Sequence, residues 1–274
     1  MSDRDALLTN PRSERIKAVA ALGRRTVRAR RERFVVEGPH AVAELLRYAG
    51  EHLVDLYVTA EAGQGHPELV EQARSAGGGV YECADHVLSV IADTPHPQGV
   101  LAVARFIDVP LADVLADVGE GFIVVLNEVR DPGNAGTVIR AADAFGARGV
   151  VLTDASVDVH HPKVIRSTVG SAFHLPISMG SSVNAVIAAC QAAGVNVLAA
   201  DGDAQTLLPD VDLTGAHAWV LGNEARGLDD HVRQACDEVV AVPTVGAAES
   251  LNMAMAATVC LHASSAVVAA GLSI

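Results

Sequence analysis

The sequence LGNEARGLDDHVRQACDEVVAVPTVGAAESLN, residues 221–252, contains two tight loops, each of which follows an apolar strand and precedes a helix. The first loop turns at Gly222 and closes at Gly227, and a short helix and a second strand follow it. That strand ends at Pro243, and a small-residue loop over 246–249 then leads into a long helix of Ala, Met and Val. Ligands of α/β proteins bind at the carboxyl ends of parallel strands, and glycine allows the backbone to approach a ligand closely. We therefore expect this pair of loops to form a cofactor pocket.

The chain upstream of these loops has the rhythm of a parallel α/β sheet. Residues 122–126 form a fully apolar strand, typical of a sheet that is buried on both faces. A polar loop over 127–136 follows, then a helix over 137–145 that Gly146 ends, and then a strand over 149–152. This alternation predicts a parallel sheet. The dinucleotide-binding pattern G-x-G-x-x-G is absent from it, although glycines beside a helix N-terminus suit an anion or a nucleotide.

Three segments occur in the order of the motifs of a known enzyme family. NEVRDPGNAGTVIRAADAFGARGVVL (127–152), GNEARGL (222–228) and VPTVGAAESLNMAMA (242–256) resemble the three motifs of the SpoU-type RNA 2′-O-methyltransferases, members of the SPOUT class. The resemblance implies an α/β fold with a parallel sheet whose C-terminal part forms a deep trefoil knot, with S-adenosylmethionine bound by the knot loops. The knot is implied by the resemblance alone, because connections in protein folds very rarely thread through loops.

The resemblance also implies methyl transfer to a ribose 2′-hydroxyl of RNA and gives roles to particular residues. Arg140 would stabilise the 2′-oxygen electrostatically, because arginine stays protonated and is a poor base. Asn134 would orient the ribose or the arginine. Glu224 would fix Arg140 or Arg166, the arginine of VIRSTVGSAFHLPI (164–177) that the resemblance assigns to catalysis or RNA contact. The expected cofactor-binding residues, mostly through backbone groups, are Ala199, Gly222, Asn223, Val242, Ser250, Leu251 and Asn252.

A homodimer is a further implication of the resemblance. Enzymes of the family usually act as dimers in which an arginine of one subunit lies near the cofactor of the other. The apolar, small-residue helix over 253–270 would form much of the contact between subunits.

The charge of the chain is distributed unevenly. The net charge is −13, yet the first 33 residues contain ten Lys or Arg and four Asp or Glu, a balance of +6, which leaves −19 for the remainder. A basic arm on an acidic body indicates RNA binding by the arm; a solvated charged helix is the alternative. We expect one helix over 10–31, capped by Asn10 and Pro11. The arginines expected to meet phosphates as planar bidentate donors are Arg24, Arg25, Arg28 and Arg30.

The N-terminal part of the chain predicts a small α/β unit over 34–108. FVVEGPHAVAELL (34–46) and HPQGVLAV (96–103) resemble the N-terminal substrate-binding domain of the same family, which is similar to a ribosomal RNA-binding protein fold. His96 and Gln98 either contact RNA or are turn residues with local partners. Because of this resemblance, ribosomal RNA is favoured over transfer RNA as the substrate.

We expect three parts in the chain: a basic arm with an RNA-binding domain (1–108), a linker (109–118) and a methyltransferase domain (119–274). Two other functions are considered: a noncatalytic knotted module that only binds RNA, and a small-molecule methyltransferase or nucleotide-binding protein. The presence of Arg140, Glu224 and the Ser-Leu-Asn triplet at 250–252 argues against the noncatalytic module. The basic arm argues against a small-molecule substrate.

Composition argues against several other classes. Four cysteines lack paired or metal-type spacing, so we expect reduced thiols in a cytoplasmic protein. The start of the chain is polar and lacks the apolar region of a signal peptide, and no uninterrupted apolar run reaches membrane-spanning length. The pair His160-His161 has no third ligand nearby, and Asp201 and Asp203 favour a turn. We therefore expect no metal and no membrane partner.

Overall fold

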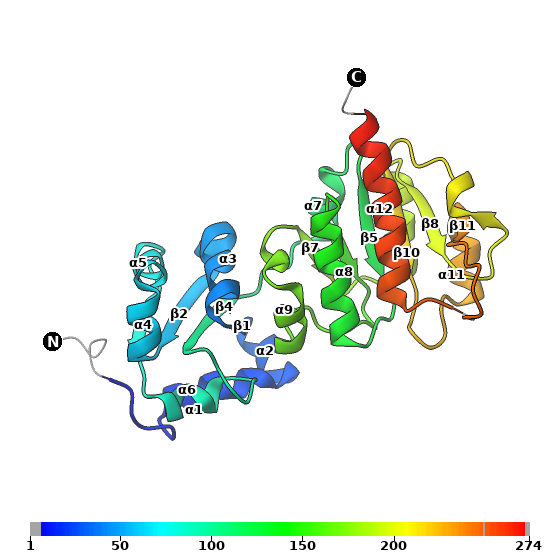
Figure 1. The fold of residues 1–274 in the computed structure, drawn as a ribbon. Helices are drawn as coiled ribbons and strands as arrows, with labels where there is room; N and C mark the ends of the chain where they lie inside the picture. The colour runs from blue at the N-terminus through cyan, green and yellow to red at the C-terminus, as the bar shows by residue number, and fades with distance from the viewer. Residues whose placement is uncertain (1–6, 249, 272–274) are drawn as a thin grey trace. The chain divides into compact units, whose positions relative to one another are not determined.

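The computed structural model describes residues 7–248 and 250–271 and divides into two compact units (Figure 1). The first unit contains the described residues up to Ile107 together with His160–His174. The second unit contains Asp108–Val159 and the described residues from Leu175 onward. The segment His160–His174 is thus flanked in sequence by the second unit but packs within the first.

The first unit is built on a four-stranded sheet in the order β1-β4-β2-β3. β4 lies between β1 and β2 and is antiparallel to both, whereas β2 and β3 are parallel. Ile16, Tyr57 and Leu88 are among the buried side chains that pack α1 and α6 onto this sheet. The strands are β1 Arg33–Glu37, β2 Leu53–Val58, β3 Gly79–Glu82 and β4 Val100–Arg105. The helices are α1 Glu14–Ala20, η1 Ala21–Gly23, α2 Arg25–Arg31, α3 Pro39–Ala49, η2 Gly50–His52, α4 Ala60–Gly65, α5 Pro67–Ser75, α6 Asp85–Ile91, α9 Pro162–Thr168 and η3 Ser171–Phe173.

The single helix expected over 10–31 is two helices, α1 and α2, joined by the 3-10 turn η1. Ser13 is the N-cap of α1 through its hydroxyl, and Asn10 instead accepts hydrogen bonds within the turn that precedes it. The expected cap at Asn10 and Pro11 was wrong because Ser13 provides the capping oxygen one turn later. Arg24 has extended backbone, with φ −92° and ψ 128°, which interrupts the helix between η1 and α2.

The second unit has a seven-stranded sheet in the order β7-β6-β5-β10-β8-β11-β9, and its neighbouring strands are parallel. The predicted parallel α/β sheet is therefore confirmed. β5 and β10 are central, and all five positions of each are buried, as expected for a sheet that is covered on both faces. The strands are β5 Phe122–Leu126, β6 Val150–Leu152, β7 Ile177–Met179, β8 Asn196–Ala200, β9 Thr206–Leu207, β10 His217–Leu221 and β11 Glu238–Ala241.

The helices expected over 137–145 and 253–270 are both present in the second unit, as α8 and α12, and the start of α8 differs from the expectation. α8 begins at Pro132 rather than at Thr137, because Asp131 caps it by accepting a 2.8 Å hydrogen bond from the N–H of Asn134. The stretch expected as a linker contains α7, whose Val114 is fully buried in the core of the second unit. The helices are α7 Leu111–Ala116, α8 Pro132–Ala144, α10 Val183–Ala192, η4 Leu208–Asp210, α11 Asp230–Ala235 and α12 Met253–Gly271.

The C-terminal helix α12 packs against α8, β8 and β10 (Figure 1). By length and composition alone, its residues Met253–Ala270 are apolar enough to cross a membrane. One face of the helix is buried, including Ala257 and Leu261, whereas Met255 and Val259 are 62% and 41% exposed. α12 is thus half core helix and half apolar surface.

A buried polar cluster fixes α12 to β10. Ser264 of α12 accepts a 2.9 Å hydrogen bond from Trp219 Nε1, and its Oγ lies 2.8 Å from His217 Nε2. His217 Nδ1 lies 3.0 Å from the carbonyl oxygen of Gly215, which can only accept. We therefore assign the proton to Nδ1, so that Nε2 accepts from the Ser264 hydroxyl. Burial lowers the pKa of His217, which keeps the ring neutral.

Candidate active site

The loops of all three motif segments leave the sheet at the same edge. Leu126 at the end of β5 is paired with Leu221 of β10, Leu221 with Ala200 of β8, and Ala200 with Val240 of β11. The carboxyl ends of these four adjacent strands are therefore aligned. Ala199, a predicted cofactor residue, is fully buried in β8 one position before this edge. The edge is where an α/β sheet binds its ligands.

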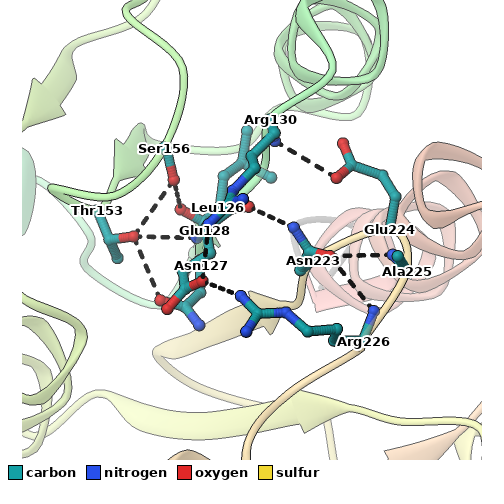
Figure 2. Close-up of polar contacts among 10 residues, drawn as sticks. All are labelled: Leu126, Asn127, Glu128, Arg130, Thr153, Ser156, Asn223, Glu224, Ala225 and Arg226. Carbon is teal, nitrogen blue, oxygen red and sulfur yellow. Dashed lines mark hydrogen bonds and ion pairs between the residues drawn. The ribbon is translucent and has the colours of Figure 1, made fainter.

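A buried network of hydroxyl and amide groups holds the backbone just after β5. Thr153 Oγ1 donates to Asn127 Oδ1 at 3.2 Å and accepts from the N–H of Glu128 at 3.2 Å. Ser156 Oγ donates to the carbonyl of Leu126 at 2.9 Å (Figure 2). Glu128 has a left-handed backbone, with φ +54°, which side chains rarely adopt. The sequence does not reveal this network, because short polar residues of this kind are common in loops.

The turn after β10 closes on itself through its backbone. Asn223 and Gly227 exchange two hydrogen bonds, with N···O distances of 3.0 and 2.9 Å. A Cβ atom on Gly222 would lie 2.4 Å from the carbonyl carbon and oxygen of Gly227, closer than real Cβ contacts allow. Gly222 is therefore required for the turn itself to close.

Asn223 connects this turn to the segment after β5. Its Oδ1 accepts from the N–H groups of Ala225 and Arg226 at 3.0 and 3.3 Å, and its Nδ2 donates to the carbonyl of Glu128 at 2.8 Å. The Arg226 guanidinium also pairs with the Glu128 carboxylate at 2.6 Å (Figure 2). Asn223 is consequently occupied by contacts within the protein, which give it a role in positioning the two loops.

Glu224 connects the turn to the N-terminus of α8. Its carboxylate accepts from the N–H groups of Arg130 and Asp131 at 3.3 and 3.1 Å, and from Asn134 Nδ2 at 3.3 Å. The resemblance predicts that Glu224 fixes Arg140 or Arg166, whereas its hydrogen-bond partners in the structure are two backbone N–H groups and the amide of Asn134, all in the first motif segment. A carboxylate beside the first N–H groups of a helix is also favoured by the helix dipole.

The third loop joins the same cluster through Asn252. Asn252 Nδ2 donates to Asn134 Oδ1 at 3.4 Å, and Asn252 Oδ1 accepts from the N–H groups of Ala254 and Met255 at the start of α12. Asn134 thus lies between Glu224 and Asn252. The structure therefore brings together residues from all three motif segments.

Other predicted cofactor residues lie along the third loop. Val242 and Leu251 are half-buried and Ser250 is exposed. Glu249, which was part of the predicted small-residue loop, lies outside the described residues. This loop offers backbone groups near the sheet edge that β8, β10 and β11 share.

The two predicted catalytic arginines lie in different units. Arg140 is exposed on α8 and forms no ion pair within the part of the chain that the structure describes. Arg166 belongs to α9 in the first unit, where its Nη1 donates to Asp93 Oδ2 at 2.8 Å. The sequence spacing of these arginines did not reveal that α9 packs with the N-terminal sheet.

The predicted RNA-binding arginines are of two kinds. Arg24, Arg25 and Arg30 are exposed on or beside α2. Arg28 is 1% exposed, and its Nη1 donates to the carbonyls of Leu22 and Gly23 at 2.9 and 2.8 Å. Arg28 is therefore a structural residue that fixes α2 to η1, because its guanidinium is used by two backbone carbonyls.

The four cysteines are free thiols, and Cys83, Cys190 and Cys260 are buried. Burial raises the pKa of the Cys190 thiol to about 11 and those of Cys83, Cys236 and Cys260 to about 12, so these thiols are poor nucleophiles at neutral pH. Among the residues that the structure describes, no group of three or more His, Cys, Asp or Glu side chains is arranged to hold a metal ion.

Comparison with known proteins identifies the family. The SpoU rRNA Methylase family matches residues 121–262, which include the whole polar cluster, and the MRM3-like substrate binding domain matches residues 13–102. The chain belongs to the SpoU rRNA methylase family. The family predicted from the three motif segments is therefore confirmed.

Relatives of this SpoU-family protein share most of its length. The 23S rRNA (guanosine-2′-O-)-methyltransferase RlmB of Bordetella pertussis is 34% identical over 236 residues, which cover 84% of this chain and 96% of the relative. An AdoMet-bound rRNA methyltransferase from Sinorhizobium meliloti has a TM-score of 0.86 with 28% identity, covering 94% of this chain and 97% of that chain. The SpoU methyltransferase AviRb from Streptomyces viridochromogenes, in complex with AdoMet, has a TM-score of 0.83 with 30% identity, covering 94% and 100%.

Proposed function

We propose that this SpoU-family protein uses S-adenosylmethionine to methylate a ribose 2′-hydroxyl in ribosomal RNA. The observation that carries the proposal is the chain of contacts Glu224–Asn134–Asn252, which joins the three motif loops at one sheet edge. The names of the Bordetella and Sinorhizobium relatives, both rRNA methyltransferases, support this substrate class. The AdoMet-bound neighbours support the cofactor.

The residues at the sheet edge fit S-adenosylmethionine. The ends of β8, β10 and β11 are aligned, and their loops offer backbone donors and acceptors beside the apolar Ala199. We assign binding of the adenine and methionine moieties to backbone groups at Ala199, Gly222, Val242 and Leu251, with Ser250 at the open side. Asn223 and Asn252 hold the loops in place through their hydrogen bonds.

The reaction would break the bond between the sulfonium sulfur and the methyl carbon, with the sulfur leaving as the thioether S-adenosylhomocysteine, and would form a bond from that carbon to the 2′-oxygen. S-adenosylmethionine supplies the electrophilic methyl group, and the hydroxyl proton leaves to solvent. The protein must align the 2′-oxygen with the methyl carbon and stabilise the negative charge that develops on the oxygen. We assign this stabilisation to Arg140, whose guanidinium is exposed and remains protonated. We assign orientation of the ribose to Asn134 and positioning of α8 to Glu224.

The proposal includes a deep trefoil knot and a homodimer. β10 lies between β5 and β8 although it follows β8 in the chain, and α12 returns to pack on α8 and β10, which supports the knot. A crystal structure in which the chain is unknotted would contradict it. The exposed Met255 and Val259 on α12 support a contact between two copies. Sedimentation tests this contact: the wild type should be dimeric and Val259→Glu monomeric, and a monomeric wild type would contradict it.

RNA binding is assigned to the first unit, which matches the substrate-binding domain over residues 13–102. The exposed Arg24, Arg25 and Arg30 would contact phosphates, and we add Arg166, which Asp93 holds in place. Because ribosomal RNA is made and assembled in the cytoplasm of bacteria such as those of the relatives, we propose a cytoplasmic location.

Methyl transfer from labelled S-adenosylmethionine tests the proposed function. Purified 23S rRNA and transfer RNA are incubated with the protein, digested to nucleosides and separated by mass. The proposal predicts a 2′-O-methyl nucleoside from 23S rRNA. A methylated base as the product, label only in transfer RNA, or no label despite cofactor binding would each contradict it.

A further inference from the structure

A polar cavity of about 640 Å³ lies in the first unit beside the HPQG segment, for which the proposed function has no specific role. Its walls come from α4 and the residues that flank it, from α6 and from the loop over 95–99. We propose that this cavity binds one unpaired RNA base that carries an amino group. The inference rests on the proposed function, because it assumes that the substrate is RNA.

The loop that forms one wall is fixed at both ends. The Glu37 carboxylate accepts from the N–H groups of Asp93 and Thr94 at 2.9 and 3.3 Å, and the carbonyl of Gly99 accepts from the N–H of Thr59 at 2.9 Å. Gly99 has φ +80°, and a Cβ atom there would lie 2.7 Å from Thr59 Oγ1. The loop can therefore lie against α4 only because this position is glycine. A wall held in this way is already formed before a ligand arrives, which reduces the entropy lost on binding.

The size and charge of the cavity select a neutral ligand. Its volume lies within the range of roughly 300–1,000 Å³ that is typical of small-ligand sites. The lining contains two carboxylates, Glu61 and Asp85, and no Lys or Arg, so a phosphate group would be repelled. A ligand that donates hydrogen bonds to carboxylates is favoured instead. The lining residues are Thr59, Glu61, Ala62, Gly65, His66, Asp85, Leu88, Ser89, Pro95, His96, Pro97, Gln98 and Gly99.

The remaining lining groups match the edges and faces of a nucleobase. Gln98 lines the cavity, and its carboxamide carries a donor and an acceptor, the combination that pairs with the amino group and N7 of adenine. His66 and His96 also line the cavity, and histidine is among the aromatic side chains on which unpaired bases stack. Adenine, cytosine and guanine carry exocyclic amino groups that carboxylates accept, whereas uracil carries none. The cavity should therefore prefer adenine over uracil.

The position of the cavity agrees with an RNA path over the first unit. Asp85, Leu88 and Ser89 bring α6 into the cavity wall, and α6 also packs against α1, which continues through η1 to the basic helix α2. The exposed arginines of α2 would hold phosphates without reading sequence, and the cavity would read one base. These two contacts differ in kind, so they can be separated by experiment.

Fluorescence anisotropy with the full-length protein tests the proposal. The probes are a labelled ten-residue oligouridylate and the same oligomer with one central adenosine. We expect the wild type to bind the adenosine-containing probe roughly tenfold more tightly, the scale of one good side-chain–base pair. Gln98→Ala should remove this preference, and Ser89→Phe, which fills the cavity from α6, should remove it independently. Gln72→Ala, an exposed glutamine of α5 outside the cavity, is the matched control and should keep it.

Two outcomes would overturn the proposal: a wild type without the preference, or a preference that persists in folded Gln98→Ala and Ser89→Phe proteins. Thermal unfolding of each variant shows that it is folded. In the methyl-transfer assay, Gln98→Ala should raise KM for rRNA and leave kcat unchanged. If the wild type prefers adenosine through Gln98 but does not methylate rRNA, the proposed function fails and the cavity assignment stands.

Discussion

The Glu224 carboxylate accepts a 3.1 Å hydrogen bond from the backbone N–H of Asp131, a residue 93 positions away in the chain. Asp131 is the N-cap of α8, the helix that contains Asn134 and Arg140. The bond therefore connects the turn after β10 to the start of the helix on which the proposed chemistry depends. A single exposed carboxylate joins two of the three loops.

Replacing this carboxylate should loosen the site without unfolding the protein. Glu224→Ala leaves three donors without their acceptor, but these donors are accessible to water, so stability should change little. We expect the Kd for S-adenosylmethionine, measured by isothermal titration, to rise by about tenfold or more. Glu224→Gln retains one acceptor oxygen and should restore part of the affinity, and exposed Glu120→Ala is the matched control. Wild-type affinity in Glu224→Ala would show that the link does not position the loops.

A methyl group at Gly222 should disrupt the turn after β10. The added Cβ would lie 2.4 Å from the backbone of Gly227, so the turn has to move away from the sheet edge. We expect Gly222→Ala to lower both the melting temperature and the affinity for S-adenosylmethionine. Gly246→Ala, in the third loop, adds the same atom where no other atom lies within 4 Å and should have little effect. Equal behaviour of the two variants would refute the steric argument.

The exposed arginines of the first unit should determine how RNA binding depends on salt. Each phosphate contact that a variant lacks reduces the number of counterions released when the RNA binds. The slope of log K against log salt concentration should therefore decrease in magnitude by about 0.7–0.9 for each contact. The triple change of Arg24, Arg25 and Arg30 to Gln should therefore reduce the slope by about 2–3. Arg28→Gln is the matched control: it should lower the melting temperature, because the carbonyls of Leu22 and Gly23 lose their donor, and leave the slope unchanged. An unchanged slope in the triple variant would show that these arginines do not contact RNA phosphates.

His217 should make stability depend on pH. Burial lowers the pKa of His217 in the folded protein. The contribution of the neutral ring to the free energy of unfolding is therefore present above the pKa of the unfolded chain, about 6.5, and is lost as pH falls through the folded pKa. His217→Phe should cost about 1–3 kcal/mol at pH 8, because buried polar partners lose their hydrogen bonds. Melting temperatures between pH 8 and 5 should fall less steeply for His217→Phe than for the wild type. The exposed His231→Ala should follow the wild type, and a wild-type slope in His217→Phe would contradict the assignment.

The strands and the family could be predicted because their signals are local. β5 is a continuous apolar run and so are residues 218–221 of β10, and the motif segments contain several glycines and prolines. The start of α8 was placed too late because Pro132 was interpreted as part of a loop, although an Asp-Pro pair is also a helix start. The break in the N-terminal helix depends on one extended residue, Arg24, which periodicity does not show.

The remaining features depend on contacts between distant residues. The exposure of an arginine is decided by tertiary packing, so Arg28 could not be distinguished from Arg24 in the sequence. The hydrogen bonds of Glu224 join residues that are 90 or more positions apart in the sequence, and the sequence does not show that they lie close together in space. The packing of His160–His174 into the first unit could not be predicted for the same reason, because it depends on contacts with residues distant in the sequence.

Single-turnover methyl transfer to 23S rRNA, with labelled S-adenosylmethionine and saturating RNA, tests the central claim most directly. The wild type should form a 2′-O-methyl nucleoside. Arg140→Ala should do so roughly two to three orders of magnitude more slowly, the scale seen when one charge-stabilising group is lost, with little change in the affinity for RNA or cofactor. Arg140→Lys keeps the charge without the planar guanidinium and should be intermediate, and exposed Arg148→Ala should match the wild type. A rate for Arg140→Ala close to that of the wild type would contradict the account.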